Sequence, residues 1–294
     1  MALSLSESAK LSNDMVTRGV IETIIESSPI LALLPFETVE GNSYKYNQEN
    51  TLGGAQFYAV NATWSEAAAT FTQKTANLAI LGGDADVDNF IQRVRSNLQD
   101  QRAIQTQLKA KSVARSFEDT FIYGSSSTDP NSFDGLMTLV TSGQTIDANA
   151  SMALATHVDP LIDKVLGAKP DVLLTTRKQR RALKALLAAS AHYVERGESS
   201  FGRQVMAYDG IPVEVSDFMV DTETTSAKTG GSQSSMYAIH FSASDGVVGL
   251  QNGGVEVVDI GQLESKDAQR VRIRWYVSIA LLRDSAVGRV KRLN

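Results

Sequence analysis

The chain contains no cysteine, which excludes disulfide bonds and thiolate metal sites. It also lacks an apolar run near the roughly 20 residues of a membrane-spanning helix, since two glutamates and two prolines interrupt the longest candidate, residues 20–36. The first ten residues, MALSLSESAK, have neither the basic start nor the apolar centre of a signal peptide. We therefore expect neither a disulfide scaffold nor a membrane protein.

Positive charge is also scarce. The formal net charge is -5 and the pI is about 5.3, whereas domains that read nucleic-acid sequence are usually basic. This balance argues against a dedicated nucleic-acid reader but not against a protein that merely encloses nucleic acid. A hydrophobic content of 43% with 21% charged residues is ordinary for a folded protein, and 294 residues fit one large domain or two smaller ones.

Residues suited to catalysis are few and scattered. The three histidines, His157, His192 and His240, lie in different predicted elements, so no Ser-His-Asp set is selected. Residues 197–200 (GESS) lack the G-x-S-x-G order of a nucleophile elbow. We therefore expect structural histidines, no catalytic residues, no cofactor and no enzymatic activity.

Three aspartates, Asp84, Asp86 and Asp88, have the spacing of the first ligands of a calcium loop. The sixth position would be Asn89 rather than glycine and the twelfth Arg95 rather than glutamate, so the calcium pattern fails. We expect no metal site and interpret the aspartates as the acidic first turn of a helix.

A long helix is predicted from residue 84 to residue 123. Apolar residues recur there at spacings close to one helix face: Val87, Ile91, Val94, Leu98, Ile104, Leu108, Val113, Phe117 and Phe121. At 1.5 Å per residue the helix would be about 60 Å long. The mostly polar stretch 100–111 indicates burial in patches only, which suits an elongated or plate-like protein.

The segments before this helix are poor in core-forming residues. Residues 20–34 form an apolar patch that fits a short helix, packed either on its own core or on a neighbouring subunit. Between residues 37 and 82, turn-forming glycines separate strand-like stretches at 44–46, 57–60 and 76–80. Because a lone hairpin is marginal in water, we expect this excursion to project from the body onto a partner.

The remainder predicts a small α/β unit followed by a closing pair of strands. The unit reads as helix 157–166, strand 172–174, helix 176–191, strand 211–215 and strand 236–241. This alternation favours a central sheet. Strand-like segments at 255–258 and 271–282 follow, and as an antiparallel pair they could pack on the long helix.

Several local stretches have a familiar composition and order: Val20-Ile21-Glu22-Thr23-Ile24, Leu33-Leu34-Pro35-Phe36, Glu40-Gly41-Asn42-Ser43-Tyr44-Lys45-Tyr46, Phe133-Asp134-Gly135-Leu136 and Arg274-Trp275-Tyr276-Val277. Together with the sequence of arm, excursion, long helix, α/β unit and strand pair, they resemble the major capsid protein of tailed bacteriophages. That family has the Hong Kong ninety-seven type fold, which it shares with encapsulins. The resemblance covers essentially the whole chain and depends more on the order of elements than on any one stretch.

The resemblance implies an α+β phage major capsid fold in four parts. These are an N-terminal arm (1–37), an extended β-hairpin loop (38–80), a peripheral domain with the spine helix (81–145 and 236–294) and an α/β axial domain (146–235). The loops of the axial domain would surround the five-fold and six-fold axes of a shell.

It also implies a function without turnover. The subunit would self-assemble as pentamers and hexamers into an icosahedral shell around double-stranded DNA, as a late structural protein of the virion that assembles in the host cytoplasm. No scaffolding segment precedes Ala2, so the resemblance implies that scaffolding is supplied by a separate protein or is not needed. Portal and decoration proteins are the other expected partners. The alternative is an encapsulin-type compartment that encloses a cargo enzyme.

Two further features bear on assembly. In the type member a loop lysine forms an isopeptide crosslink, but Lys45 and Lys74 cannot be matched to its local pattern, so the crosslink is not carried over to this chain. The densest basic cluster, Arg177–Lys184, presents one helix face. Phosphates of packaged DNA are one partner for that face. We favour the other, acids on this chain or a neighbour such as Glu195 or Asp221.

Overall fold

The computed structural model describes residues 29–90, 93, 101–189, 195–198 and 204–294. Within these residues the strands form a four-stranded sheet, a seven-stranded sheet and a two-stranded hairpin. The two larger sheets are joined through one continuous core, and the hairpin leaves that core.

The four-stranded sheet has the order β1, β11, β12, β4. Its strands are β1 Phe36–Thr38, β4 Ala79–Asp88, β11 Val247–Gln262 and β12 Ala268–Leu281. β1 is parallel to β11, and the other neighbours are antiparallel. Along β12 the buried residues Val271, Ile273 and Trp275 alternate with arginines, so the sheet has one buried face and one polar face.

Helices α4 (Gln101–Tyr123) and α2 (Pro29–Leu33) cover the buried face of this sheet. Phe117 of α4 is completely buried, and its ring centroid lies 5.0 Å from that of Trp275 and 6.3 Å from that of Phe36. These tilted aromatic contacts add to the burial of the rings themselves.

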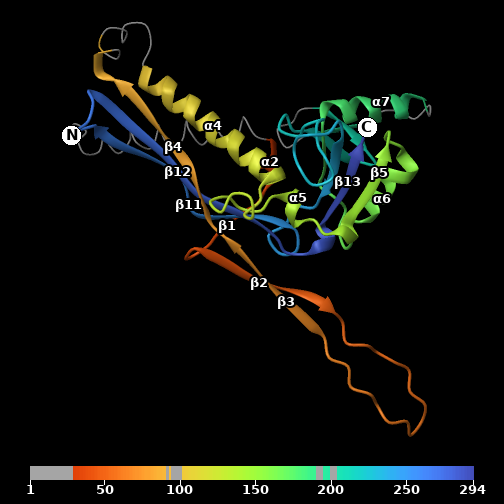
Figure 1. Ribbon diagram of the computed structural model, residues 1–294. Coiled ribbons are helices and arrows are strands. Elements are labelled where there is room, and N and C mark those ends of the chain that lie inside the picture. Colours follow the sequence, from red (N-terminus) through yellow and green to blue (C-terminus); the bar gives the residue numbers. More distant parts are fainter. Residues whose placement is uncertain (1–28, 91–92, 94–100, 190–194, 199–203) are drawn as a thin grey trace, which may run out of the picture.

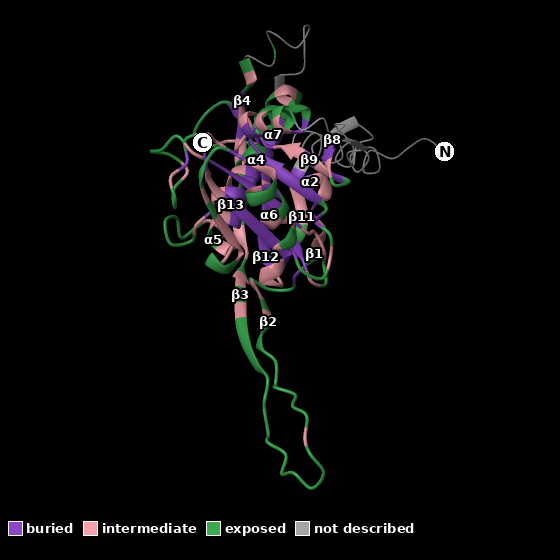
Figure 2. Cartoon of the chain, turned by 90° about the vertical axis from the view of Figure 1, so that its right-hand side faces the viewer, coloured by how far each residue is buried: buried purple, intermediate pink, exposed green. Residues whose placement is uncertain are grey.

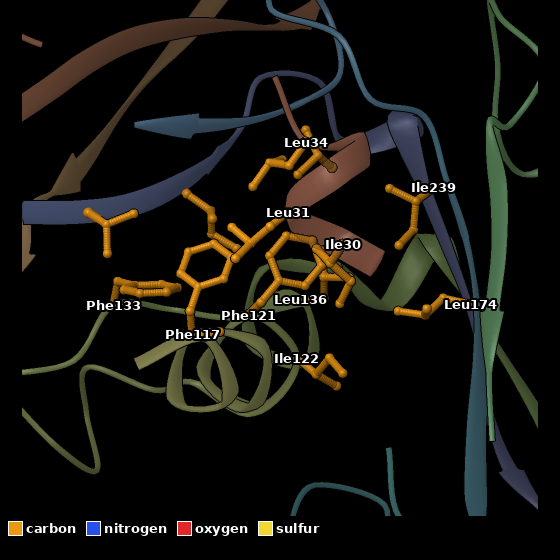
Figure 3. Close-up of a cluster of buried hydrophobic side chains, with 14 of the residues drawn as sticks. Ile30, Leu31, Leu34, Phe117, Phe121, Ile122, Phe133, Leu136, Leu174 and Ile239 are labelled. Carbon is orange, nitrogen blue, oxygen red and sulfur yellow. The ribbon is translucent and has the colours of Figure 1, made fainter. Parts of the chain in front are cut away.

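The segment of α2 packs on its own chain. Figure 3 shows Ile30, Leu31 and Leu34 beside Phe117 and Phe121 of α4. All five side chains are buried. Residues 29–34, the described part of the apolar patch, therefore pack on the core of their own chain, which is the first of the two predicted alternatives.

The seven-stranded sheet has the order β5, β13, β10, β6, β9, β8, β7. Its strands are β5 Thr145–Ala150, β6 Val172–Thr175, β7 Glu195–Glu198, β8 Gln204–Tyr208, β9 Ile211–Val215, β10 Ser234–Ile239 and β13 Val287–Leu293. Leu161 of α6 (Asp159–Asp163) and Leu183 of α7 (Arg177–Ala189) share a core with one face of the sheet. The opposite face contributes Leu174, Tyr237 and Ile239 to the core around α4.

Short helical elements complete the body: α5 Leu136–Leu139, two 3-10 turns at Ser142–Gln144 and Asp284–Ala286, and a π-helical turn at Leu154–Val158. Gly135, just before α5, allows two chain segments to touch. A Cβ atom there would lie 2.4 Å from the carbonyl oxygen of Thr120 and 2.7 Å from the amide nitrogen of Gly124, so only glycine fits. The end of α4 is therefore fixed against the turn that follows it.

The hairpin consists of β2 (Ser43–Thr51) and β3 (Thr70–Asn77). In Figure 1 it projects from the lower side of the body, away from α4 and α7. The four-stranded sheet lies under α4 on the left and the seven-stranded sheet lies on the right, so the molecule is elongated as the sequence predicted.

The predicted start of the long helix is wrong. Residues 79–88 form strand β4, in which Ala85 and Val87 are buried against α4 while Asp84 and Asp86 lie on the other face. The stretch DADVD alternates polar and apolar residues with a period of two, which is a strand signal. The helix is confirmed from Gln101 to Tyr123, although Leu108 on its predicted apolar side is 54% exposed.

Other predicted bounds also change. Residues 57–60 form no strand, and the helix predicted at 157–166 is instead the π-helical turn at 154–158 followed by α6. The predicted strand at 76–80 is divided at Leu78 between β3 and β4. The strands predicted at 172–174, 211–215, 255–258 and 271–282 are confirmed, as is the antiparallel pairing of the last two.

The domain division stays a prediction. β10 and β13 belong to segment 236–294 in that division, except for the first residues of β10, yet they are hydrogen-bonded into the same sheet as β6. The apolar residues at 20–28, with Ile91, Val94 and Leu98 of the predicted helix, lie outside the described residues.

The aromatic core generates a stability prediction. Phe117→Ala should lower the free energy of unfolding by about 3–5 kcal/mol, because the substitution leaves a cavity among Phe36, Phe133 and Trp275. Leu108→Ala on the exposed side of the same helix is the matched control and should change it by less than about 0.5 kcal/mol. Urea unfolding of the unassembled protein measures both, and equal effects of the two substitutions would contradict this packing.

Candidate assembly surfaces

The hairpin ends in an apolar tip that the body does not cover. Leu52, Phe57, Val60 and Trp64 lie between the two strands of the hairpin, and all four side chains are exposed, Trp64 at 77%. Figure 2 shows the tip as an almost continuous exposed segment. A cluster of large apolar side chains on a projecting segment is a feature of surfaces that bind another protein.

Part of the tip is already ordered. The rings of Tyr58 and Trp64 stack with centroids 4.4 Å apart, and the Ser65 amide donates a hydrogen bond to the Tyr58 hydroxyl at 3.1 Å. These contacts hold an aromatic pair in one geometry before any partner is present. Preorganisation of this kind lowers the entropy cost of binding.

The base of the hairpin is anchored to the body at several points. Gln48 Nε2 donates to the Leu281 carbonyl at 2.8 Å, and Lys74 Nζ lies 2.8 Å from Asp284 Oδ1. Burial, together with the nearby Asp284 carboxylate, raises the pKa of Tyr46 to about 12. Lys74 thus serves an intrachain ion pair, and Lys45 is exposed. The direction of the hairpin is set where it leaves the sheet.

A cavity of about 530 Å³ lies beside this base. Tyr46, Leu78 and Ile80 line it from the hairpin side and Phe133 and Ile279 from the body. Ile80 is 77% exposed although it faces the cavity, so this region also presents apolar surface.

The polar face of the four-stranded sheet is neutralised by its own ion pairs. Arg270 binds Asp86 and Arg272 binds Asp84 through two hydrogen bonds each, all 2.7–2.9 Å long. The Arg270 guanidinium holds the pKa of the Asp86 carboxyl well below its usual range. The aspartates thus join β4 to β12. Neither the predicted acidic helix turn nor a calcium loop describes their role.

A buried acid joins helix α4 to the seven-stranded sheet. Glu223 is 1% exposed and accepts hydrogen bonds of 2.5 Å from the Tyr123 hydroxyl at the end of α4 and from the Ser235 hydroxyl at β10. Arg289 of β13, which is also buried, lies 3.5 Å from it. Burial raises the pKa of Glu223 despite these partners. The network fixes the relative position of the two sheets.

The basic helix α7 has only part of its charge satisfied by its own chain. Arg177 forms a two-bond ion pair with Asp217, whereas Asp221 instead accepts a hydrogen bond from Thr176. Pairing of this face with Asp221 of a neighbouring copy stays a prediction, and the Glu195 side chain lies outside the described part. Arg180, Arg181 and Lys184 are exposed on the remaining face.

The histidines take separate structural positions. His240 Nδ1 lies 2.9 Å from Asp171 Oδ2, and His157 Nδ1 accepts a hydrogen bond from the Ala153 amide at 3.1 Å. His192 and residues 199–200 fall outside the described residues. Over the described ranges there is no group of histidine and acidic side chains that could hold a metal ion, and no helix is apolar and long enough to span a membrane.

A body of two sheets with a projecting hairpin, whose apolar tip is exposed, is typical of proteins that assemble with other polypeptides, as shell subunits do. The chain belongs to the SU10 major capsid protein family, whose model matches residues 8–224. That match spans about three quarters of the 294 residues. The protein is therefore a structural protein of a capsid.

Solved structures show the same fold at low identity. The SrpI encapsulin of Synechococcus elongatus PCC 7942 matches with a TM-score of 0.72 at 19% identity, covering 90% of this chain and 87% of that one. The capsid protein of a native GTA particle gives 0.64 at 15%, covering 91% of both, and that of Mycobacterium phage Adephagia gives 0.64 at 15%, covering 90% and 89%. The fold is the Hong Kong ninety-seven type. No curated protein sequence matches the chain.

Sequence reasoning missed two of these features. The ion pairs between β4 and β12 could have been predicted from the sequence. Aspartates at 84, 86 and 88 and arginines at 270, 272 and 274 both recur with a period of two, as residues on one face of paired strands do. No sequence signal indicated that Glu223 is buried, because it lies in a polar segment rich in serine and glycine that resembles an exposed loop.

The buried network yields a second stability prediction. Glu223→Ala should lower the free energy of unfolding by about 3–5 kcal/mol, because it leaves the Arg289 charge buried without its partner. Glu264→Ala, at an exposed acid, should change it by less than about 0.5 kcal/mol.

The double variant Glu223→Ala with Arg289→Met tests whether the unpaired Arg289 charge causes the loss of stability, since it removes this charge together with its partner. It should regain part of the loss in the same urea-unfolding measurement. A double variant whose loss equals the sum of the losses of the two single variants would show that the charges are not coupled.

Proposed function

We propose that the protein assembles as pentamers and hexamers into an icosahedral shell that encloses double-stranded DNA. The observation that carries the proposal is the apolar hairpin tip, whose side chains find no cover on their own body. Copies of the chain in a closed shell supply the missing surface, and each copy both gives a hairpin and receives one. The mechanism is assembly rather than turnover, with no catalytic residue.

Each of the proposed domains has its own role in the shell. Segment 146–235 forms the axial domain around the symmetry axes, and 81–145 with 236–294 forms the peripheral domain. The hairpin and the N-terminal arm reach across neighbours. Scaffolding, portal and decoration proteins are separate chains, the shell is the capsid of the virion, and it forms in the host cytoplasm.

An encapsulin-type compartment around a cargo enzyme is the second candidate, supported by the likeness to the SrpI encapsulin. The capsid family model favours the DNA-filled shell. Negative-stain microscopy of the purified protein should show closed shells, and nuclease-protected DNA in particles from infected cells should separate the two candidates. Neighbouring genes for a terminase and a portal give the same distinction.

The tip generates an assembly prediction. Phe57→Ala combined with Trp64→Ala should abolish shells at concentrations where the natural protein forms them, since buried aromatic side chains at the centre of an interface contribute about 2 kcal/mol or more each. Because both side chains are exposed in the single chain, the free energy of unfolding should stay within about 0.5 kcal/mol. Sedimentation and electron microscopy measure the shells.

Thr63→Ala, an exposed polar position in the same tip, is the matched control and should assemble normally. Shells that form from the double variant at unchanged concentration would contradict a role of the tip in assembly.

A further inference from the structure

The outer face of α7 is a dense positive patch. Five basic residues and no acidic one lie in the helix, and the sequence has no acid between Asp171 and Glu195. Asp217 neutralises only Arg177. Arg180, Arg181 and Lys184 are exposed, and within the described residues none of them forms an ion pair with an acid.

A second group of cations lies on the outer side of α4. Ala110, Ala114 and Phe117 face the sheet, which leaves Lys111 and Arg115, one helical turn apart, on the exposed side. In Figure 1, α4 and α7 both lie along the upper side of the molecule. One side of the plate therefore carries two rows of cations.

Several exposed acids of the chain lie away from this side. Glu40, Glu49 and Glu66 are exposed on the hairpin, which leaves the body on the opposite side (Figures 1 and 2). A neighbouring copy in a shell has the same orientation, so its hairpin acids also lie away from the α4–α7 side. The polar face of the four-stranded sheet has its acids occupied by arginines.

We propose that the α4–α7 side is the inner wall of the shell and that Arg180, Arg181 and Lys184 contact the phosphates of the enclosed double-stranded DNA. This inference rests on the proposed function and names the surface that meets the genome. Duplex DNA carries one negative charge per about 1.7 Å of its axis, so a spread of unpaired cations suits it without any contact to bases.

The test is the salt dependence of DNA binding by the unassembled full-length protein. Fluorescence anisotropy with a labelled DNA duplex gives the slope of log K against log salt, to which each phosphate contact contributes about 0.9. Arg180→Gln with Arg181→Gln should reduce that slope by about 1.8. Between 50 and 200 mM salt the natural protein should thus lose about tenfold more affinity than the variant.

Two controls define the outcome. Arg180→Lys with Arg181→Lys keeps the charge and should keep the slope, and Lys45→Gln removes an exposed cation on the hairpin and should leave the slope unchanged. If Arg180→Gln with Arg181→Gln leaves the salt slope unchanged, the inference is overturned, whether or not the variant assembles. If the slope is unchanged and shells are lost, this face contacts a neighbouring copy instead of DNA. Absence of measurable DNA binding by the natural protein also overturns it.

Failure of the proposed function gives a different result. In that case the natural protein forms no shells, whereas the DNA slopes are still measured on single subunits. A reduced slope in the Gln variant then still shows that this face binds DNA phosphates, whereas its place on an inner wall fails together with the shell.

Discussion

The packing of α4 on the four-stranded sheet is the constraint on which the rest of the structure depends. Phe117 lies between Trp275 of β12 and Phe36 of β1, and thereby joins three segments that are far apart in the sequence. β1 and β11 extend from this contact to the cluster that anchors Tyr44 and Tyr46 at the hairpin base. Tyr123, the last residue of α4, reaches Glu223 and the seven-stranded sheet. One helix thus determines where both the hairpin and the second sheet lie.

This rigid body contrasts with the hairpin tip. The body buries Phe117, Phe121 and Trp275 and pairs its sheet charges internally, while the tip leaves Phe57 and Trp64 exposed. Exposure of that kind is costly only while the chain is alone, so the same residues favour association. The molecule therefore divides into a part that is complete by itself and a part whose free energy is lowered by a partner.

The elements that the sequence predicted well are those with a strong period. Strands at 172–174 and 271–282 and the buried positions Val113, Phe117 and Phe121 follow from hydrophobic patterning alone. The predicted start of the helix was wrong because DADVD fits both an acidic helix turn and a two-residue alternation. Only the arginines of β12, 184 and 188 residues later, decide between the two. The candidate surfaces were predicted in outline, because a shortage of core residues in the hairpin is visible in composition. The Glu223 network was not, since burial of that loop is a property of the tertiary structure.

Assembly energetics explain why a hairpin with so few apolar residues suffices in the proposed shell. Burial of four large apolar side chains contributes about 1.5–3 kcal/mol each, or roughly 6–12 kcal/mol in total. The loss of translational and rotational freedom on pairing costs about 4–15 kcal/mol, so a single docked tip is marginal. In a closed ring each subunit gives one tip and receives another, while the last subunit closes two contacts for one loss of freedom. Weak individual contacts then allow errors to dissociate before closure, and closure makes the complete shell stable.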